Sequence, residues 1–223
     1  MRILVVAPHP DDEVLGCGGT LLKKSSEGHI IGWLLVTTIT DEAGWSLEAI
    51  SSRDKEIEHV RQDLKILPEN LFKLGFPTSQ LDEIPLGRLI SSMSQVFKKF
   101  QPDEVFLPHP SDIHTDHRIS FEAASACTKW FRYPSVKRVM AYETLSETDF
   151  SINPSIDTFR PNVFVDISNH LCGKIDLLKI YQSELGAHPF PRNLEAVKSQ
   201  AILRGTQCGT QASEAFQLLR SFE

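Results

Sequence analysis

Two short stretches of this chain concentrate the residue types that bind metal ions and move protons. Residues 9–13 read HPDDE and residues 109–117 read HPSDIHTDH, so four of the eight histidines lie in these two stretches. A catalytic zinc site takes three nitrogen or oxygen ligands from the protein and keeps one position open for water. The candidate ligands and catalytic groups are His9, Asp11, Asp12, His114, Asp116 and His117.

Such a set of groups around one divalent ion suits the hydrolysis of an amide. The ion lowers the pKa of a bound water towards ~7 and polarises a carbonyl group. A further carboxylate can act as general base, and a further histidine as acid or oxyanion stabiliser. The spacing of these residues does not separate ligands from catalysts.

Each motif taken alone also has a plain structural interpretation. Aspartate is a preferred helix N-cap residue, so the first motif could simply begin a helix. A lone His-x-x-His pair, such as residues 114–117, usually arises by chance. Both motifs together, each directly after an expected strand, favour a metal site.

The apolar pattern predicts strands that alternate with helices. The unbroken apolar run at residues 3–7 is typical of a buried parallel strand. Further strands are expected at residues 30–37, 71–74, 104–107, 138–142 and 163–167. Helices are expected at residues 12–28, 50–67, 86–100, 119–130, 171–185, 193–203 and 212–222.

This alternation predicts an α/β, Rossmann-like fold, with a mostly parallel β-sheet and helices on both faces. No repeat or linker divides the chain, so residues 1–223 are expected to form one domain. Ligands of open parallel sheets bind beyond the carboxyl ends of the strands. Since both motifs follow strands directly, we expect them to meet there.

Composition argues against several other classes of protein. The net charge is −6, and no basic cluster of the kind that binds nucleic acid is present. No apolar stretch approaches the ~20 residues of a membrane span. The short apolar run at the N-terminus predicts a strand and not a signal peptide, and the four scattered cysteines are expected to be reduced. A cytoplasmic location is therefore expected.

The motifs resemble those of a known family. Residues 8–13 (PHPDDE), 15–19 (LGCGG) and 114–117 (HTDH) closely resemble the LmbE-like, or PIG-L, family of zinc-dependent N-deacetylases. The resemblance covers most of the chain, and continues through residues 40–44, Arg53, Glu56, residues 76–77 and residues 204–216. It implies an LmbE-like fold and the removal of acetyl groups from N-acetylglucosaminyl compounds.

The resemblance also implies a role for each residue of the site. It makes His9, Asp12 and His117 the ligands of one Zn²⁺ per chain, although the same ligands also suit Fe²⁺. By the same resemblance, Asp11 is the general base. His114 stabilises the oxyanion and protonates the leaving amine, and Asp116 holds His114 in orientation.

Residues expected around the substrate are less well defined. The resemblance points Arg53 towards the substrate pocket, while an ion pair with Glu56 or Glu58 explains it equally well. His188 and Arg192 lie in a proline-rich loop that could line the substrate rim, form an oligomer contact, or do neither.

The sequence gives weaker indications for three further residues. Where the family often shows Tyr-x-Ser-Gln, this chain has Glu184 as the fourth residue, and its role is open. His109 and Asp112 are expected beside the metal ligands, as groups that orient them.

The leading expectation is a zinc-dependent N-deacetylase whose partner is a small amino-sugar substrate. One alternative is an amidase that cleaves a thiol-sugar conjugate with the same site. Another is a non-catalytic sugar- or metal-binding protein, which Asp11 and His114 argue against because a pure binder does not need them. The resemblance further suggests a homo-oligomer, a trimer or a hexamer.

Overall fold

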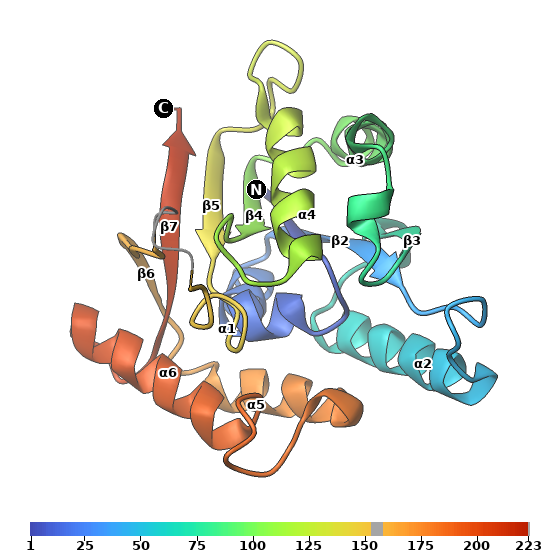
Figure 1. Ribbon diagram of the computed structural model, residues 1–223. Helices are drawn as coiled ribbons and strands as arrows, with labels where there is room; N and C mark the ends of the chain where they lie inside the picture. Colours follow the sequence, from blue (N-terminus) through green and yellow to red (C-terminus); the bar gives the residue numbers. More distant parts are fainter. Residues whose placement is uncertain (153–157, 223) are drawn as a thin grey trace.

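A computed structural model describes residues 1–152 and 158–222, which form a single sheet covered by helices (Figure 1). The elements follow one another as β1 (Arg2–Ala7), α1 (Asp12–Ser26), β2 (Ile30–Thr38), α2 (Leu47–Asp63), β3 (Leu71–Pro77), α3 (Leu86–Phe100), β4 (Glu104–Pro108), α4 (Thr115–Ser125), β5 (Arg138–Tyr142), β6 (Val163–Asp166), α5 (Leu171–Ile180), α6 (Leu194–Cys208) and β7 (Ser213–Ser221). Short 3₁₀ turns, including Gln182–Glu184, connect some of them.

The strand order places the two motifs at neighbouring strand ends. The sheet runs β3-β2-β1-β4-β5-β7-β6, and β1 to β5 are all parallel to one another. From β1 the chain builds β2 and β3 on one side, then returns to add β4 on the other. The gap between β1 and β4 is therefore the switch point at which ligands bind in open parallel sheets.

Strand β7 corrects the prediction of a final helix at residues 212–222. It pairs antiparallel with both β5 and β6, and in Figure 1 its arrow points against that of β5. Its first four residues are all buried, because they lie between two strands and under α6. Glu, Ala, Gln and Leu favour helix locally, but pairing on both sides overrides such a weak preference. The predicted mostly parallel sheet is confirmed, with an antiparallel edge.

Two apolar layers enclose the sheet. Ile3, Val5 and Ala7 face a core that includes residues of α1, α2, α5 and α6, whereas Leu4 and Val6 face α3 and α4. Successive residues of a strand point to opposite faces, so a strand covered on both faces is apolar throughout. Residues 3–7 are continuously apolar because both faces of β1 are covered.

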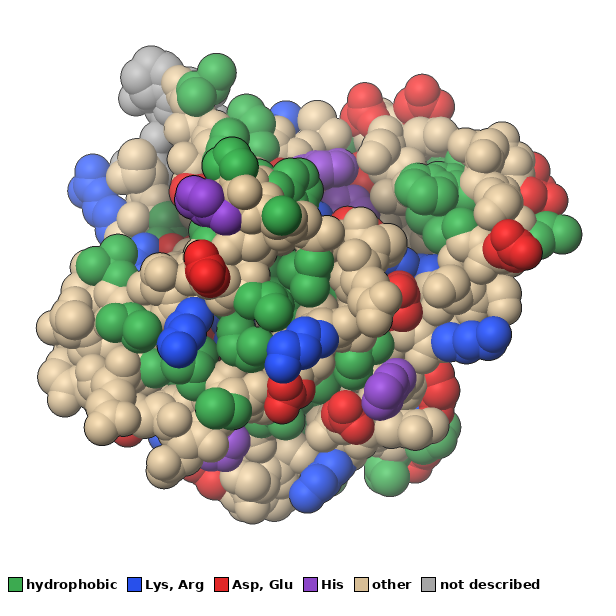
Figure 2. Space-filling view, turned by 90° about the horizontal axis from the view of Figure 1, so that it is seen from below, with side chains coloured by type: hydrophobic (Ala, Val, Ile, Leu, Met, Phe, Trp, Pro, Cys, Tyr) green, Lys and Arg blue, Asp and Glu red, His purple; other side chains and the backbone are tan. Residues whose placement is uncertain are grey.

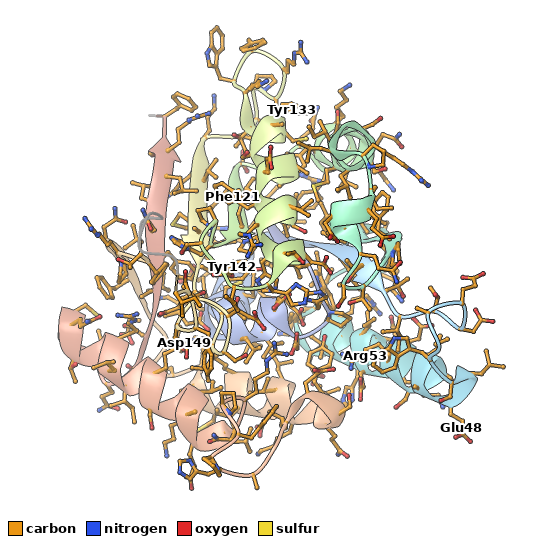
Figure 3. All side chains as sticks on the ribbon, in the orientation of Figure 1. Glu48, Arg53, Phe121, Tyr133, Tyr142 and Asp149 are labelled. Carbon is orange, nitrogen blue, oxygen red and sulfur yellow. The ribbon has the colours of Figure 1, made fainter. Side chains whose placement is uncertain are left out.

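A glycine lets helix α1 lie close to the end of β5. A Cβ atom on Gly16 would lie 2.2 Å from Cδ2 of Tyr142. Figure 3 shows Tyr142 beside α1, and its hydroxyl donates a 2.8 Å hydrogen bond to the carbonyl of Val6 in β1. The ring thus links β5, β1 and the helix that begins at Asp12.

The surface has no single dominant charge on the face seen in Figure 2, where acidic, basic and histidine side chains are interspersed with apolar ones. Among the described helices, none is both long and apolar enough to cross a bilayer.

Candidate metal and catalytic site

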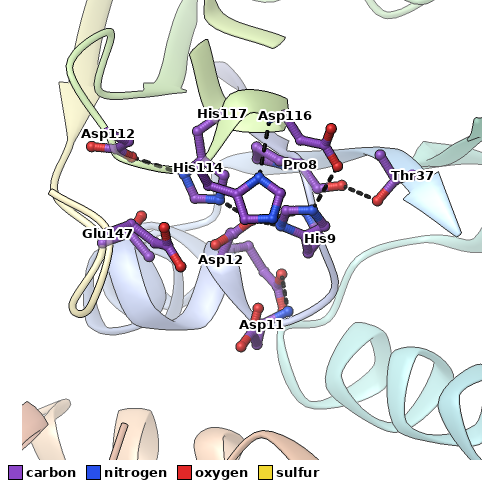
Figure 4. A network of polar contacts seen from close by, with 12 residues as sticks. Pro8, His9, Asp11, Asp12, Thr37, Asp112, His114, Asp116, His117 and Glu147 are labelled. Atoms are coloured by element: carbon purple, nitrogen blue, oxygen red, sulfur yellow. Dashed lines mark hydrogen bonds and ion pairs between the residues drawn. The ribbon is translucent and has the colours of Figure 1, made fainter. Parts of the chain in front are cut away.

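The two motifs meet at the ends of β1 and β4. His9, Asp12 and His117 each offer one ligand atom, and these atoms lie within 4.8 Å of one another. Figure 4 shows the three histidines grouped near Asp12, with Asp112 and Asp116 on opposite sides. Residues far apart in sequence therefore form one cluster at the predicted place.

The ring of His117 is fully buried, and Asp112 holds it at one of its two nitrogens. Its Nδ1 lies 2.8 Å from Oδ2 of Asp112, whose Oδ1 accepts a 2.6 Å hydrogen bond from Thr148 Oγ1. Its Nε2 lies 3.2 Å from Oδ2 of Asp12, without the geometry of a hydrogen bond. The ring thus presents one nitrogen to an orienting carboxylate and the other to the centre of the cluster.

His9 is arranged in the same way. Its Nε2 lies 3.0 Å from Oδ2 of Asp116, and its Nδ1 lies 3.3 Å from Oδ2 of Asp12. The Asp116 carboxylate also accepts backbone N–H bonds from Ser79 at 2.7 Å and Leu81 at 3.1 Å. Carboxylates bound to the outer nitrogen of a histidine are the usual support of metal-binding imidazoles.

Two buried atoms that lack a hydrogen-bond partner indicate where a cation fits. Oδ1 of Asp12 and Nε2 of His117 are buried without a hydrogen-bond partner among residues 1–152 and 158–222. Buried polar atoms are nearly always hydrogen-bonded, so such a pair calls for an explanation. A divalent ion held by two imidazoles and a carboxylate would supply it.

A second overlapping group, formed by His9, His114 and Asp116, also lies within 4.8 Å. The Asp116 carboxylate in that group already accepts bonds from one imidazole and two backbone amides. We therefore favour the group that contains Asp12 and His117 as the metal site.

Charges around the two histidines change their proton affinity in the metal-free protein. Burial lowers the pKa of His9, but hydrogen bonds to Asp116 and Asp12 outweigh it and raise the pKa to about 9. Burial likewise lowers the pKa of His117, and Asp12 and Asp112 raise it to about 10. Burial raises the pKa of Asp12, yet His117 and His9 hold it well below its usual range.

Asp11 is buried in an unusual backbone conformation. Its φ is 124°, a region that side-chain-bearing residues rarely adopt and that costs about 1–3 kcal/mol. Burial, and then the charge of Asp12, raise its pKa to about 8, although Arg192 acts in the opposite direction. Nη1 of Arg192 lies 3.2 Å from Oδ2 of Asp11 and holds the carboxylate in place.

His114 caps helix α4 and is neutral at physiological pH. Its Nδ1 accepts a 3.1 Å hydrogen bond from the backbone N–H of Asp116. Burial, and then the charges of His9 and His117, lower its pKa to about 4. A neutral imidazole that accepts at Nδ1 carries its proton on Nε2.

The contacts of Asp116 differ from the expectation. We expected its carboxylate to orient His114, but the carboxylate contacts His9, and only the backbone N–H reaches His114. The reason is the loop after β3, whose backbone amides at Ser79 and Leu81 fix the carboxylate on the side of His9.

A pocket of about 690 Å³, counting its open mouth, lies beside this cluster. Its wall includes His9, Asp11, Trp45, Arg53, Glu184 and Arg192.

The three residues expected around the substrate have different positions. Arg53 and Arg192 line the pocket, whereas His188 is exposed and is not among the described residues that line it. Arg53 also forms the expected ion pair with Glu56, at 3.1 Å, and its contact with a substrate stays a prediction. Figure 3 shows Arg53 on the inner side of α2.

Other groups near the site were missed from the sequence. Glu13 is buried, accepts a 2.7 Å bond from Oη of Tyr181, and has its pKa raised to about 8 by burial. Glu147 lies 2.7 Å from Nη2 of Arg192. The position of Glu13 in the first motif was a usable signal, but the placement of Glu147 and Trp45 depends on loops that the sequence does not specify.

Of the two residues expected to orient ligands, Asp112 contacts His117. His109 lies farther out, where its Nε2 is 3.1 Å from Oε1 of Gln217 and its Nδ1 is 2.6 Å from Oγ of Ser111.

Comparison with known proteins gives three related findings. Diacetylchitobiose deacetylase of Thermococcus kodakarensis is 23% identical over 226 residues, which cover 98% of this chain and 83% of the relative. The solved structure of N,N'-diacetylchitobiose deacetylase from Pyrococcus horikoshii has a TM-score of 0.78 at 23% identity, over 98% of this chain and 84% of that one. The structure of 4-carboxy-2-hydroxymuconate hydratase from Pseudomonas putida has a TM-score of 0.70 at 18% identity, over 100% and 98% of the two chains.

The solved structures establish the fold, and the hydratase shows that the fold hosts more than one reaction. A family model described as PIG-L, GlcNAc-PI de-N-acetylase, matches residues 4–128, which is more than half of the chain and contains every candidate metal ligand. The chain therefore belongs to the PIG-L, or LmbE-like, family of deacetylases.

Proposed function

We propose that this protein is a metal-dependent hydrolase that removes the N-acetyl group from an N-acetylated amino sugar or its conjugate. The observation that carries the proposal is the pair of buried atoms without a hydrogen-bond partner, Asp12 Oδ1 and His117 Nε2, beside a pocket that Asp11 and His114 line. The names of the family and of the diacetylchitobiose deacetylases support an N-acetylated sugar as the substrate class.

His9, Asp12 and His117 would hold one divalent ion, which we propose to be Zn²⁺. When bound, such an ion supplies positive charge that acidifies a water molecule and polarises the substrate carbonyl. Asp112 and Asp116 keep the two imidazoles in the required orientation through their outer nitrogens.

Asp11 is the proposed general base. A base works best when its pKa lies near the operating pH, and in the metal-free protein burial raises the pKa of Asp11 to about 8. The guanidinium of Arg192 fixes the carboxylate, so that the oxygen which removes a proton from the attacking water has a defined position.

His114 is the proposed oxyanion stabiliser, and it acts as a hydrogen-bond donor with a neutral ring. Because its Nδ1 accepts the Asp116 amide, its Nε2–H is free to donate to the oxygen that becomes negative as the amide is attacked. The departing amine takes the proton that Asp11 removed from the water, because the neutral ring of His114 would become an imidazolate if it gave up its only proton. The amine then leaves as the amino sugar.

The test is acetate release from a panel of N-acetylglucosamine conjugates by the zinc-loaded protein. We expect release that a chelator abolishes and that added Zn²⁺ restores. Release that persists after the metal is removed would exclude the metal-dependent mechanism. If zinc-loaded protein releases no acetate from any member of the panel, the proposed activity is wrong.

A further inference from the structure

Glu184 lies between the two arginines of the pocket wall. Its Oε1 forms an ion pair with Nη2 of Arg53, and its Oε2 lies 3.5 Å from Nη1 of Arg192. The side chain is 30% exposed and lines the pocket. A single carboxylate of the chain thus bridges two guanidinium groups that come from α2 and from the loop before α6.

Paired guanidinium groups are the usual protein ligands of carboxylates and phosphates, because their forked N–H donors match two oxygens at once. In this pocket the chain's own carboxylate already occupies that position. An anionic substituent of a substrate would have to displace Glu184 or approach it against charge repulsion.

Other carboxylates neutralise the far sides of the same arginines. Nε of Arg53 lies 3.1 Å from Glu56, and Nη2 of Arg192 lies 2.7 Å from Glu147. Asp11 adds a third carboxylate at 3.2 Å from Arg192. The two positive charges in the pocket wall are therefore balanced by acidic groups before any substrate enters.

We propose that Glu184 makes the pocket select uncharged amino-sugar conjugates over phosphorylated or carboxylated ones. This inference rests on the proposed function and names its substrate class. Glu184 is a specificity residue, since its carboxylate fills the place where an anionic group would bind.

The test uses sugars that lack an amide, so that binding is measured independently of deacetylation. Methyl glucoside and glucose 1-phosphate share a pyranose ring and differ in charge. Their affinities for the zinc-loaded wild-type protein and for Glu184→Gln are measured by calorimetric titration. Glutamine keeps the shape and an oxygen acceptor for Arg53 but removes the charge.

We expect the wild-type protein to prefer methyl glucoside. Glu184→Gln should bind glucose 1-phosphate at least about tenfold more tightly than wild type does, which corresponds to about 1.4 kcal/mol, with less than a threefold change for methyl glucoside. Glu184→Asp keeps the charge and should retain the wild-type preference.

Glu56→Gln is the matched control. It removes the same charge from the other side of Arg53, but Glu56 is not among the described residues that line the pocket. We expect less than a threefold effect on either sugar.

An unchanged ratio of affinities in Glu184→Gln would overturn the inference. An equal gain of affinity for glucose 1-phosphate in Glu56→Gln would also overturn it, because loss of any nearby negative charge would then explain the effect. The inference would fail as well if neither sugar bound to any of the proteins. Acetate release tests the proposed function separately, so failure of one idea is distinguishable from failure of the other.

Discussion

At the scale of single residues, Asp11 combines two unfavourable features. Its φ of 124° strains the backbone, and its buried carboxyl has a pKa raised to about 8 by burial and by Asp12. Strained conformations and perturbed pKa values both concentrate at functional sites. The two features on one residue beside the candidate ligands support its role as base.

Asp11→Asn should retain zinc but lose ~10²-fold or more of kcat, since general bases contribute about that much. A carboxyl acts as base only when ionised, so wild-type activity should rise with pH through its pKa, and this limb should be absent from the residual activity of the variant. Steady-state rates from pH 5 to 10, with zinc content measured in parallel, test this. A variant with normal turnover would exclude Asp11 as the base.

Metal binding should release protons from His9 and His117. Their pKa values of about 9 and about 10 mean that both rings are protonated at pH 7 in the metal-free protein, and a ligand nitrogen must lose its proton. Apparent zinc affinity should therefore rise with pH, with about two protons released per ion near pH 7.

Calorimetric titration of zinc in buffers of different ionisation enthalpy measures this proton release. His29→Gln, at a ring that contacts the N-terminal amine, should release the same number as wild type. A pH-independent affinity would show that the two rings do not both hold a proton in the metal-free protein and lose it to the ion.

At the scale of secondary-structure elements, the position of α1 depends on Gly16. A Cβ there would meet the ring of Tyr142 at 2.2 Å, which is far closer than any side-chain carbon is found. Gly16→Ala should therefore lower the free energy of unfolding by about 1–3 kcal/mol, the typical cost of overpacking. Zinc affinity should fall as well, because α1 begins at Asp12.

Gly87→Ala in α3 is the matched control, since nothing lies within 4 Å of the position of its Cβ. Alanine in an open helix position should raise the free energy of unfolding by up to about 1 kcal/mol. Urea unfolding and zinc titration of both variants check the two effects. Equal stability of Gly16→Ala and wild type would show that α1 can move away from Tyr142 without cost.

The alternation of strands with helices and the meeting of the two motifs were predictable from sequence, because apolar runs mark buried strands and parallel strands end at one edge. Strand β7 was not predictable, since its helix-favouring residues take their conformation from the strands on either side. The contact of Asp116 with His9 was missed for a similar reason. It depends on backbone amides at Ser79 and Leu81, whose place follows from the path of a loop.

At the scale of the whole molecule, a carboxyl is buried at the other end of the sheet from the site. Glu104 begins β4, is 2% exposed, and has an Oε2 without a hydrogen-bond partner among the described residues. Burial raises its pKa above the ordinary value of 4.5, although Lys24 and Arg138 act in the opposite direction.

This raised pKa predicts how stability depends on pH. Between pH 4.5 and the raised value, the native state holds a proton that the unfolded state has lost, so stability falls as pH rises through this window. Glu104→Gln should remove that fall and increase stability at pH 7 by on the order of 1 kcal/mol. Catalysis should be unaffected.

Urea unfolding at several pH values tests the prediction for Glu104. Glu42→Gln, in an exposed loop, should change stability by less than about 0.5 kcal/mol at any pH. Parallel pH profiles of Glu104→Gln and wild type would mean that the buried carboxyl has the same pKa in the native and unfolded states.

The cytoplasmic location and the trimer or hexamer stay predictions from sequence.

The residues proposed for the reaction and two residues of the pocket wall lie in different parts of the chain. The candidate ligands and the proposed base lie in the part that the family model matches, whereas Glu184 and Arg192 follow it. If these residues have the proposed roles, substitutions in the carboxyl-terminal portion can alter substrate choice while the candidate ligands and the base stay unchanged. Such an exchange must preserve the contacts between the two parts, among them those of Arg192 with Asp11 and of Tyr181 with Glu13.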